Sequence, residues 1–484
     1  MRPKLELLDR PLIERILDEA FRLIMRPGVR VAPQVHGLLA DAGVGVEEGV
    51  ARIPEGLARQ ALASAPREFF LYAREGRAVV RYGGDDVHYD PGSSCLNILD
   101  SETTQPRPAQ ASDLARLVQV AEMLPQFAAQ ATATVCNDVP EDIGDWYRLL
   151  VVLWYSAKPV VTGAFSGPGL KTMLDLLAEE SGSREALRYK PRAVFDVCPS
   201  PPLNWSEFAS ANLTELARAG IPAEIVSMPM AGATAPVTLA GAVVQHAAEC
   251  ISGIVIHQLA GPGAPVVWGG APSIFDMRTG TTPLGSIEST MLNLACSQIG
   301  KFLGLPTHGY LVNTDGRSVD AQAGMESGLS AALGALAGIN MISGAGMLDS
   351  VACHSVEKLV IDAEAIASAE RLVQGIEPRG ESLATAMFVK TGLRGDFLKL
   401  QETRLLFRSE QHFPSAVIER GGPATGSNAF ARARQHAAEL QAGYARPRLA
   451  GAREEAILTF ARGRARQAGL DALPGIDRAA VERV

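Results

Sequence analysis

Short apolar segments that favour β-strands recur along the middle of this chain, and a longer amphipathic stretch follows each of them. Their starts lie roughly 30 to 45 residues apart, a spacing typical of βα units in a parallel sheet. Strands that are apolar on both faces are typical of sheets covered by helices. Seven such runs are present, at residues 127–135, 159–161, 193–197, 224–228, 265–268, 307–312 and 339–343.

Two architectures share this rhythm, the closed (β/α)8 barrel and the open doubly wound sheet. The glycine fingerprint GxGxxG, which follows the first strand of dinucleotide-binding open sheets, is missing from the sequence. Gly263, Gly269 and Gly270 flank one strand but lack that spacing. We therefore predict an α/β fold of the (β/α)8 TIM-barrel type, and we expect its eighth strand at residues 387–389.

The segments on either side of this region differ from it in pattern. Residues 1–107 combine apolar positions at helical spacing with a partly alternating stretch at 67–82, which predicts an N-terminal helical and β-ribbon cap. Residues 108–418 are assigned to the catalytic barrel. From 419 to 484 the chain passes a turn containing Gly and Pro and becomes rich in Arg and Ala, which predicts a C-terminal helical appendage.

Charge and composition exclude several classes of partner. The net charge is −8 and no run of Lys and Arg is present, so we expect no nucleic acid partner. The N-terminus lacks the apolar core of a signal peptide, and no stretch of about 20 uncharged apolar residues predicts a membrane span. The six cysteines are scattered without a CxxC pair, so free thiols are expected. These features predict a cytoplasmic protein and leave homo-oligomerisation open.

Five segments of the barrel region are distinctive enough to compare with known families. They are MPMAGATAPVTLAG at 228–241, DMRTG at 276–280, GSIE at 285–288, LGLP at 303–306 and GAGMLDS at 344–350. Together they resemble the trimethylamine–corrinoid methyltransferase family, and the likeness extends over most of the chain. The resemblance implies a (β/α)8 barrel that moves a methyl group from a methylated amine to the cobalt of a separate corrinoid protein.

The sequence departs from the family pattern at two places. Archaeal members read pyrrolysine in the stretch similar to NTDGRSVDAQ at 313–322, and here this stretch contains standard residues only. Whether Gly316 or Arg317 occupies the special position stays open. The family often has histidine where Glu402 stands, and a glycine pair earlier in that segment is incomplete.

The missing residue bears on the substrate. A neutral tertiary amine that loses a methyl group would expel an amide-like anion, so it must first be protonated or captured as an adduct. A quaternary ammonium leaves as a neutral tertiary amine and needs only a nucleophile such as Co(I). The standard residues at 313–322 therefore favour a small quaternary amine, such as a betaine, over trimethylamine. Family members without pyrrolysine are thought of as betaine or carnitine demethylases, which points the same way.

The sequence also bears on the cofactor. The lower-ligand motif Asp-x-His-x-x-Gly is absent, so we expect no tightly bound cofactor in this chain. Cobalamin would be supplied by a partner corrinoid protein, with a folate as the alternative acceptor. Cys353 and His354 are adjacent rather than spaced as metal ligands, and no metal is predicted.

Barrel active sites lie at the carboxyl ends of the strands, so residues in or after the predicted strands are the candidates. For substrate binding these are Trp205, Trp268 and Tyr310, because an aromatic face attracts an onium group by about 0.5 to 2 kcal/mol. The alternative is that these rings fill the core. His308 and His354 are the candidates for binding a substrate carboxylate, and structural roles are the alternative for both.

The catalytic candidates surround the special position or carry charge near it. They are Asp315, Gly316, Arg317, Asp320 and Glu288. Glu288 either neutralises the onium charge or favours a helix N-terminus. Helix capping is likewise the alternative for the two aspartates.

The sequence leaves two other functions open. Gly344 and Gly346 after the seventh run are compatible with a barrel enzyme acting on a phosphate-bearing substrate. The same fold could also serve as a non-catalytic onium-binding protein, because a fold does not determine chemistry.

Overall fold

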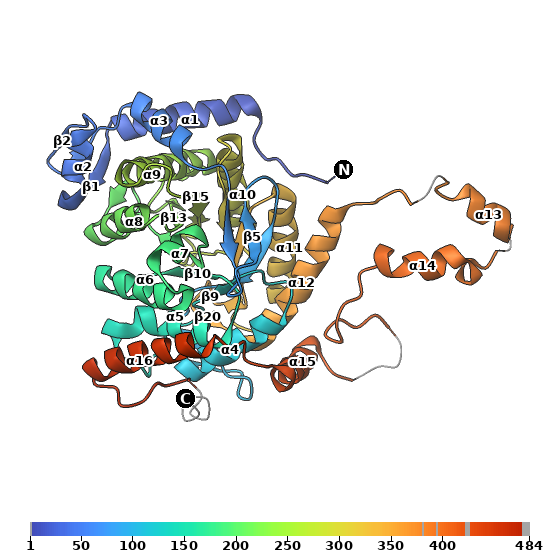
Figure 1. Cartoon of the computed structure of the whole chain (residues 1–484). Coiled ribbons are helices and arrows are strands. Elements are labelled where there is room, and N and C mark those ends of the chain that lie inside the picture. Colours follow the sequence, from blue (N-terminus) through green and yellow to red (C-terminus); the bar gives the residue numbers. More distant parts are fainter. Residues whose placement is uncertain (1, 380–381, 394, 422–425, 477–484) are drawn as a thin grey trace.

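The computed structural model of the chain describes residues 2–379, 382–393, 395–421 and 426–476. Eight parallel strands surround one axis, and a helix follows each of them (Figure 1). In chain order the strands are β6 (His88–Pro91), β9 (Gln130–Ala131), β10 (Val160–Gly163), β11 (Ala193–Val197), β13 (Ala223–Ser227), β15 (Val266–Gly270), β17 (His308–Tyr310) and β18 (Met341–Ala345). The helices that follow them are α4 (Ala111–Met123), α5 (Gly144–Tyr155), α6 (Gly167–Ser181), α8 (Glu207–Ala219), α9 (Leu239–Ala260), α10 (Ile287–Phe302), α11 (Ala321–Ala337) and α12 (Val356–Gln374).

Hydrogen bonds close these strands into a barrel. Strands β9, β10, β11, β13 and β15 pair in that order, and β17, β18 and β6 form a second parallel set. The two sets join at a parallel bridge between Trp268 and Thr307. They join again where the Ala128 amide donates to the Tyr89 carbonyl at 3.0 Å. The predicted (β/α)8 barrel is therefore confirmed.

The eighth strand is not where the sequence predicts it. Residues 387–389 lie in the short helix α13 (Thr385–Thr391), so that strand prediction is wrong. The missing strand is β6, which comes first in the barrel and lies within the segment assigned to the cap. Its sequence HYDP carries a carboxylate that faces the barrel interior, so it lacks the apolar run by which the other strands were found. The three-part division of the chain remains a prediction.

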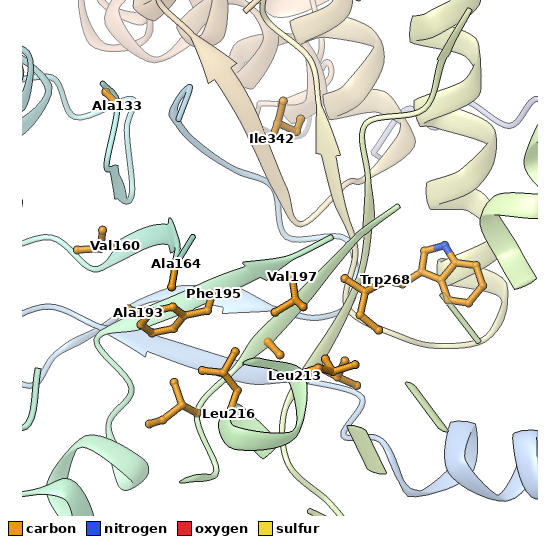
Figure 2. Packing of buried hydrophobic residues seen from close by; sticks show 14 of the residues in the cluster. Ala133, Val160, Ala164, Ala193, Phe195, Val197, Leu213, Leu216, Trp268 and Ile342 are labelled. Atoms are coloured by element: carbon orange, nitrogen blue, oxygen red, sulfur yellow. The ribbon is translucent and has the colours of Figure 1, made fainter. Parts of the chain in front are cut away.

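Side chains alternate between the two faces of each barrel strand. On β11, Phe195 and Val197 face outward beside Leu213 and Leu216 of α8 (Figure 2). Asp196, which lies between them, faces the interior. This alternation decides which residues reach the inside of the barrel.

A hairpin closes the amino-terminal end of the barrel. It consists of β4 (Phe69–Tyr72) and β5 (Ala78–Tyr82), which pair antiparallel. Its inner side chains pack against one inward residue from each of five strand segments, Ala129, Val161, Val194, Val267 and Met341. The interior is therefore apolar at this end, and a ligand can enter only at the opposite end.

The N-terminal segment covers one side of the barrel. It contains α1 (Arg10–Met25), β1 (Val29–Val31), η1 (Pro33–Val35), α2 (His36–Asp41), β2 (Val46–Glu47), β3 (Val50–Ala51) and α3 (Glu55–Ser64). Helices α1 and α3 pack on α9. Helix α9 is long and apolar enough to cross a membrane, but 83% of its most apolar window is buried inside the fold. It is therefore a core helix.

Local sequence signals set where the barrel helices begin. Five of them start after a hydroxyl residue whose side chain accepts a hydrogen bond from the backbone amide three residues on, namely Ser166, Ser206, Thr238, Ser286 and Ser355. Such caps satisfy amides that have no partner within the helix. The loops hold short pieces: β7 (Asn97–Leu99), β8 (Pro106–Pro108), η2 (Glu141–Ile143), α7 (Arg184–Tyr189), β12 (Asn204–Trp205), β14 (Met230–Ala231), β16 (Ser273–Ile274), β19 (Met347–Leu348) and β20 (Cys353–His354).

After α12 the chain leaves the barrel and returns. An arm made of α13, η3 (Phe397–Lys399) and α14 (Gln401–Glu410) projects away from the body (Figure 1). Helices α15 (Ala429–Gly443) and α16 (Gly451–Gln467) then pack back onto α12, α4 and α6. The predicted C-terminal helices are thus present, and residues 477–484 lie outside the described residues.

Candidate active site

A cavity of about 1070 Å³ opens at the carboxyl ends of the barrel strands. Its walls are the strand ends and the loops that follow them. The lining includes Ser93, Ser94, Gly163, Phe165, Asp196, Cys198, Phe208, Val226, Met228, Met230, Thr234, Thr281, Thr282, Tyr310, Asp349 and Ser350. Among the described residues that line it, the charged side chains are Asp196 and Asp349, and both are negative.

Strand register places Asp196 at the floor of this cavity. It lies two residues beyond Val194, which packs on the hairpin at the closed end. In the parallel register between β11 and β13, Asp196 pairs with Glu224. Both side chains therefore point into the barrel side by side, with Asp196 on the cavity side.

A layer of polar side chains crosses the barrel interior beneath the cavity. Glu224 Oε1 lies 2.8 Å from His308 Nδ1, and the Tyr82 hydroxyl donates to Glu224 Oε2 at 3.2 Å. His308 Nε2 lies 3.0 Å from Ser343 Oγ, which in turn donates to Asp90 Oδ1 at 2.6 Å. The chain of contacts connects the carboxylates of β13 and β6.

Two aspartic acids inside the barrel, Asp196 and Asp90, hold their protons more tightly than a free aspartic acid does. Burial raises the pKa of Asp196 well above its usual value, and the charges of Glu224 and Asp90 raise it further. Burial, with a contribution from Glu224, likewise raises the pKa of Asp90. A cation placed above Asp196 would favour its ionised form, because opposite charges stabilise one another at short range.

Aromatic and sulfur-containing side chains form much of the cavity wall. Tyr310 faces inward, and its hydroxyl accepts a hydrogen bond of 2.7 Å from the Ser93 amide. Phe165 and Phe208 stand at the rim, where they are 59% and 37% exposed. The thioethers of Met228 and Met230 lie on the same lining. Aromatic faces and polarisable sulfur suit a cation that carries methyl groups.

The stretch that resembles the pyrrolysine region lies behind one wall. Asp315 Oδ1 accepts a hydrogen bond of 2.8 Å from Ser350 Oγ, and burial raises the Asp315 pKa. The Gly316 carbonyl accepts from the Asp349 amide at 3.0 Å. Arg317 Nε donates to Asp349 Oδ1 at 2.8 Å. Because Asp349 and Ser350 line the cavity, these three candidates support its wall rather than form it.

Two other acidic candidates sit at helix starts. Asp320 caps α11, where its carboxylate accepts from the Gln322 and Ala323 amides at 2.9 and 3.4 Å. Glu288 is exposed in the first turn of α10. Neither belongs to the described lining of the cavity.

Both tryptophan candidates are packed away from the cavity. Trp205 is buried between secondary elements, and its indole donates to Ser252 Oγ at 2.9 Å. Trp268 points outward from β15 (Figure 2), and its indole donates to the Cys296 carbonyl at 2.9 Å. The described lining of the cavity contains neither ring, so we do not keep them among the proposed substrate contacts.

The two histidine candidates have different surroundings. His308 belongs to the polar layer below the cavity. His354 is fully buried against Gly346, and burial together with the nearby Lys358 lowers its pKa to about 3. It is therefore neutral at physiological pH, and we do not keep it as the group that binds a carboxylate.

The carboxylates inside the barrel, Asp90, Asp196 and Glu224, were not among the site residues predicted from the sequence. A signal was present, since Asp196 and Glu224 each interrupt an otherwise apolar strand. An acid in such a strand is buried at a cost unless it has a function or a partner. Among the described residues, no group of three or more His, Cys, Asp or Glu side chains is arranged to hold a metal ion.

The fold and the site define the class of protein: a TIM-barrel protein whose cavity, at the catalytic end of the barrel, suits a small cation. The chain belongs to the trimethylamine methyltransferase family, because the family model described as trimethylamine methyltransferase (MTTB) matches residues 1–469. Membership of this family makes it a methyltransferase.

Individual relatives agree with the family assignment. Trimethylamine methyltransferase MttB of Methanosarcina thermophila is 32% identical over 417 residues, which cover 83% of this chain and 85% of that protein. Glycine betaine methyltransferase of Desulfitobacterium hafniense (strain Y51) is 27% identical over 418 residues, covering 85% of this chain and 87% of that protein. The crystal structure of Methanosarcina barkeri monomethylamine methyltransferase (MtmB) matches with a TM-score of 0.52 at 12% identity, over 96% of this chain and 89% of that chain. This last likeness shows the fold alone.

Proposed function

We propose that this protein transfers a methyl group from a quaternary amine, of the glycine betaine, proline betaine or carnitine kind, to the Co(I) of a separate corrinoid protein. The observation that carries the proposal is Asp196, a carboxylate at the floor of a cavity whose charged lining, among the described residues, is only negative. A quaternary ammonium is permanently positive, and its methyl groups match the apolar wall. A relative named glycine betaine methyltransferase supports the same substrate class.

The side chains that line the cavity have separate roles in the proposed reaction. Asp196 pairs with the onium charge, while Tyr310 and the rim phenylalanines contact its methyl groups, each ring contributing about 0.5 to 2 kcal/mol. When the methyl group leaves, the nitrogen becomes neutral and Asp196 loses its counter-ion. Its raised pKa then favours uptake of a proton. Glu224 pairs with Asp196 in the strand register, and Glu224 Oε1 lies 2.8 Å from His308 Nδ1, so these are the titratable groups placed to exchange that proton with Asp196.

The corrinoid, when bound, supplies the nucleophile that accepts the methyl group. Ligand cavities span about 300 to 1000 Å³, so this one, at about 1070 Å³, is large for a single small amine. Phe165 and Phe208, exposed at the rim, are the side chains that would flank an incoming group. We expect the methyl transfer to take place in the cytoplasm.

Hydroxyl groups and one buried cation are suited to the carboxylate of a betaine. Ser93 and Ser94 line the cavity, and Arg148 donates to Ser94 Oγ at 2.9 Å from behind the wall. Arg148 is 1% exposed, and its nearest carboxylate oxygen, on Asp145, is 3.9 Å away. Its positive charge therefore acts on the cavity through Ser94. From the sequence, binding of the substrate carboxylate was assigned to His308 and His354. The same lining argues against a phosphate-bearing substrate, which would meet two carboxylates.

A methyl-transfer assay tests the proposal. The enzyme is mixed with a corrinoid protein whose cobalt has been reduced to Co(I), and the absorbance change on cobalt methylation is followed. We expect methylation from a quaternary amine, strongly reduced turnover of trimethylamine, and none without the corrinoid protein. A parallel reaction with tetrahydrofolate in place of the corrinoid protein tests the alternative acceptor. Equal turnover of trimethylamine would contradict the proposed leaving-group chemistry, and ligand binding without transfer would indicate an onium-binding protein.

A further inference from the structure

Gly163 is the last residue of β10 and faces the inside of the barrel. It lies two residues beyond Val161, which packs on the hairpin at the closed end, and it lines the cavity. In the parallel register between β10 and β11 it pairs with Asp196. Adjacent strands lie about 4.8 Å apart, so Gly163 occupies the place beside the carboxylate on the cavity floor. A glycine inside a strand weakens it and often marks a site where a ligand approaches closely.

Backbone conformation does not require a glycine at this position. Glycine is needed where φ is positive, as at Gly344, where φ is 127°. Gly163 is not one of the described residues with a positive φ, and it has the ordinary conformation of a β-strand. An alanine could therefore adopt the same backbone.

The packing of the protein does not require a glycine there either. A Cβ on Gly163 would lie 3.5 Å from the Cβ and from the carbonyl oxygen of Asp196, which is ordinary van der Waals contact. Gly269, another inward-facing glycine of the barrel, differs in this respect. A Cβ there would lie 2.8 Å from the Ile225 carbonyl oxygen and 3.1 Å from His308 Nδ1. Close packing thus accounts for Gly269 and leaves Gly163 without a structural reason.

The space at Gly163 lies where a quaternary ammonium needs room. Methyl groups surround the charge of such a group, so its nitrogen stays farther from a carboxylate oxygen than the nitrogen of an ammonium ion does. The methyl groups then extend sideways over the strands next to Asp196. On β10 that neighbour is Gly163, and Phe165, two residues further on, stands at the rim. The open place therefore lies between the floor and the rim, beside the carboxylate.

We propose that Gly163 determines how many methyl groups the site accepts on nitrogen, because its missing side chain leaves room beside Asp196 for a methyl group of a quaternary amine. This inference rests on the proposed function, in which Asp196 holds the onium charge. A side chain at position 163 would fill the space and favour an amine with fewer methyl groups. Such an amine needs less room, and its N–H can approach the carboxylate oxygen to about 2.8 Å.

Gly163→Ala tests the inference by titration calorimetry with glycine betaine and dimethylglycine. The two ligands share a carboxylate and differ by one methyl group on nitrogen. One carbon too many in a filled pocket costs about tenfold or more in affinity. We therefore expect the Kd of glycine betaine to rise by about tenfold or more and the Kd of dimethylglycine to change little. The ratio of the two constants is the decisive quantity.

Thermal unfolding separates a loss of room from a loss of fold. The melting temperature of Gly163→Ala should equal or slightly exceed that of the wild type, because alanine in a compatible backbone lowers the entropy of the unfolded chain. Gly56→Ala is the matched control. It changes an exposed glycine of α3 at which a Cβ would meet no atom within 4 Å, and it should leave both affinities unchanged.

The outcomes separate this inference from the proposed function. If Gly163→Ala binds glycine betaine as the wild type does, or loses equal affinity for both ligands, the inference is overturned and the proposed function stands. A variant that does not fold would show that packing needs the glycine, and would overturn the inference as well. A wild type that binds neither ligand would instead contradict the proposed function itself.

Discussion

At the scale of single residues, the chemistry depends on the protonation of Asp196. In the ligand-free protein, burial and two neighbouring acids raise its pKa, so Asp196 keeps its proton to a higher pH than a free aspartic acid does. A carboxyl whose pKa is higher in the folded than in the unfolded chain stabilises the fold at low pH, and this contribution is lost as the pH rises through the raised value. Ionising Asp196 near neutral pH therefore lowers the free energy of unfolding, but the ionised side chain can hold a cation.

Asp196→Asn should separate these two effects. We expect the affinity for a quaternary amine to fall by about 2 kcal/mol or more, roughly 30-fold, because the onium loses its charge partner. Affinity for the neutral isostere 3,3-dimethylbutanol should stay the same, and the melting temperature near neutral pH should not fall. Titration calorimetry and thermal unfolding measure both. The control Asp349→Asn removes the other lining carboxylate, which is bound to Arg317 at the rim, and should cost less. Equal losses for the charged and neutral ligands would show that Asp196 acts by shape.

Binding of a quaternary amine should also release protons. The ligand favours the ionised form of Asp196 and so lowers a pKa that is raised in the free protein. Calorimetry in two buffers of different ionisation enthalpy, at pH values below that raised pKa, measures the number released. We expect net release in the wild type and much less in Asp196→Asn. A wild type that binds without exchanging protons would indicate that Asp196 is already ionised in the empty cavity.

At the scale of helices and strands, apolar runs in the sequence predicted where most barrel strands lie. The side of each strand on which a residue lies was not predicted. Seven barrel strands were located because buried strands are apolar on both faces. Trp268 was misplaced because the side of a strand was not considered: Val267 and Gly269 face inward, so the residue between them faces the helices. The same alternation applied to β11 and β13 would have placed Asp196 and Glu224 inside.

Asp320, a catalytic candidate in the sequence, has a structural role at the start of helix α11. Its carboxylate caps α11, so Asp320→Ala should lower the free energy of unfolding by about 1 kcal/mol. Ligand affinity should change little, since the residue is outside the described lining of the cavity. Asp320→Asn retains a capping side chain and should recover most of the lost stability. A large loss of affinity at unchanged stability would return Asp320 to the catalytic candidates.

At the scale of the whole molecule, the sequence predicted the barrel and the end of it at which the site lies, but not the strand that completes it. The strand β6 was missed because HYDP looks like a turn, and it becomes a strand only through pairing with β18. The run MFV at 387–389 has a strand-like composition but no sheet to join, and it is helical in the arm. Whether a short apolar segment becomes a strand is decided by its partners, which one sequence does not reveal.

Ligands should stabilise the whole protein according to their charge. A ligand present at 100 times its Kd adds about 2.7 kcal/mol to the free energy of unfolding, and in a large domain about 1 kcal/mol shifts the melting temperature by roughly 2 to 4 °C or less. We therefore expect a rise of a few degrees with saturating glycine betaine, carnitine or choline. No rise is expected with inorganic phosphate, because the two charged groups of the described lining are carboxylates. Arg148→Met should reduce the rise given by the two carboxylated ligands and leave that of choline unchanged, since choline has no anionic end for Arg148 to attract. A protein stabilised by phosphate and not by any onium ligand would contradict both the assigned cavity and the substrate class.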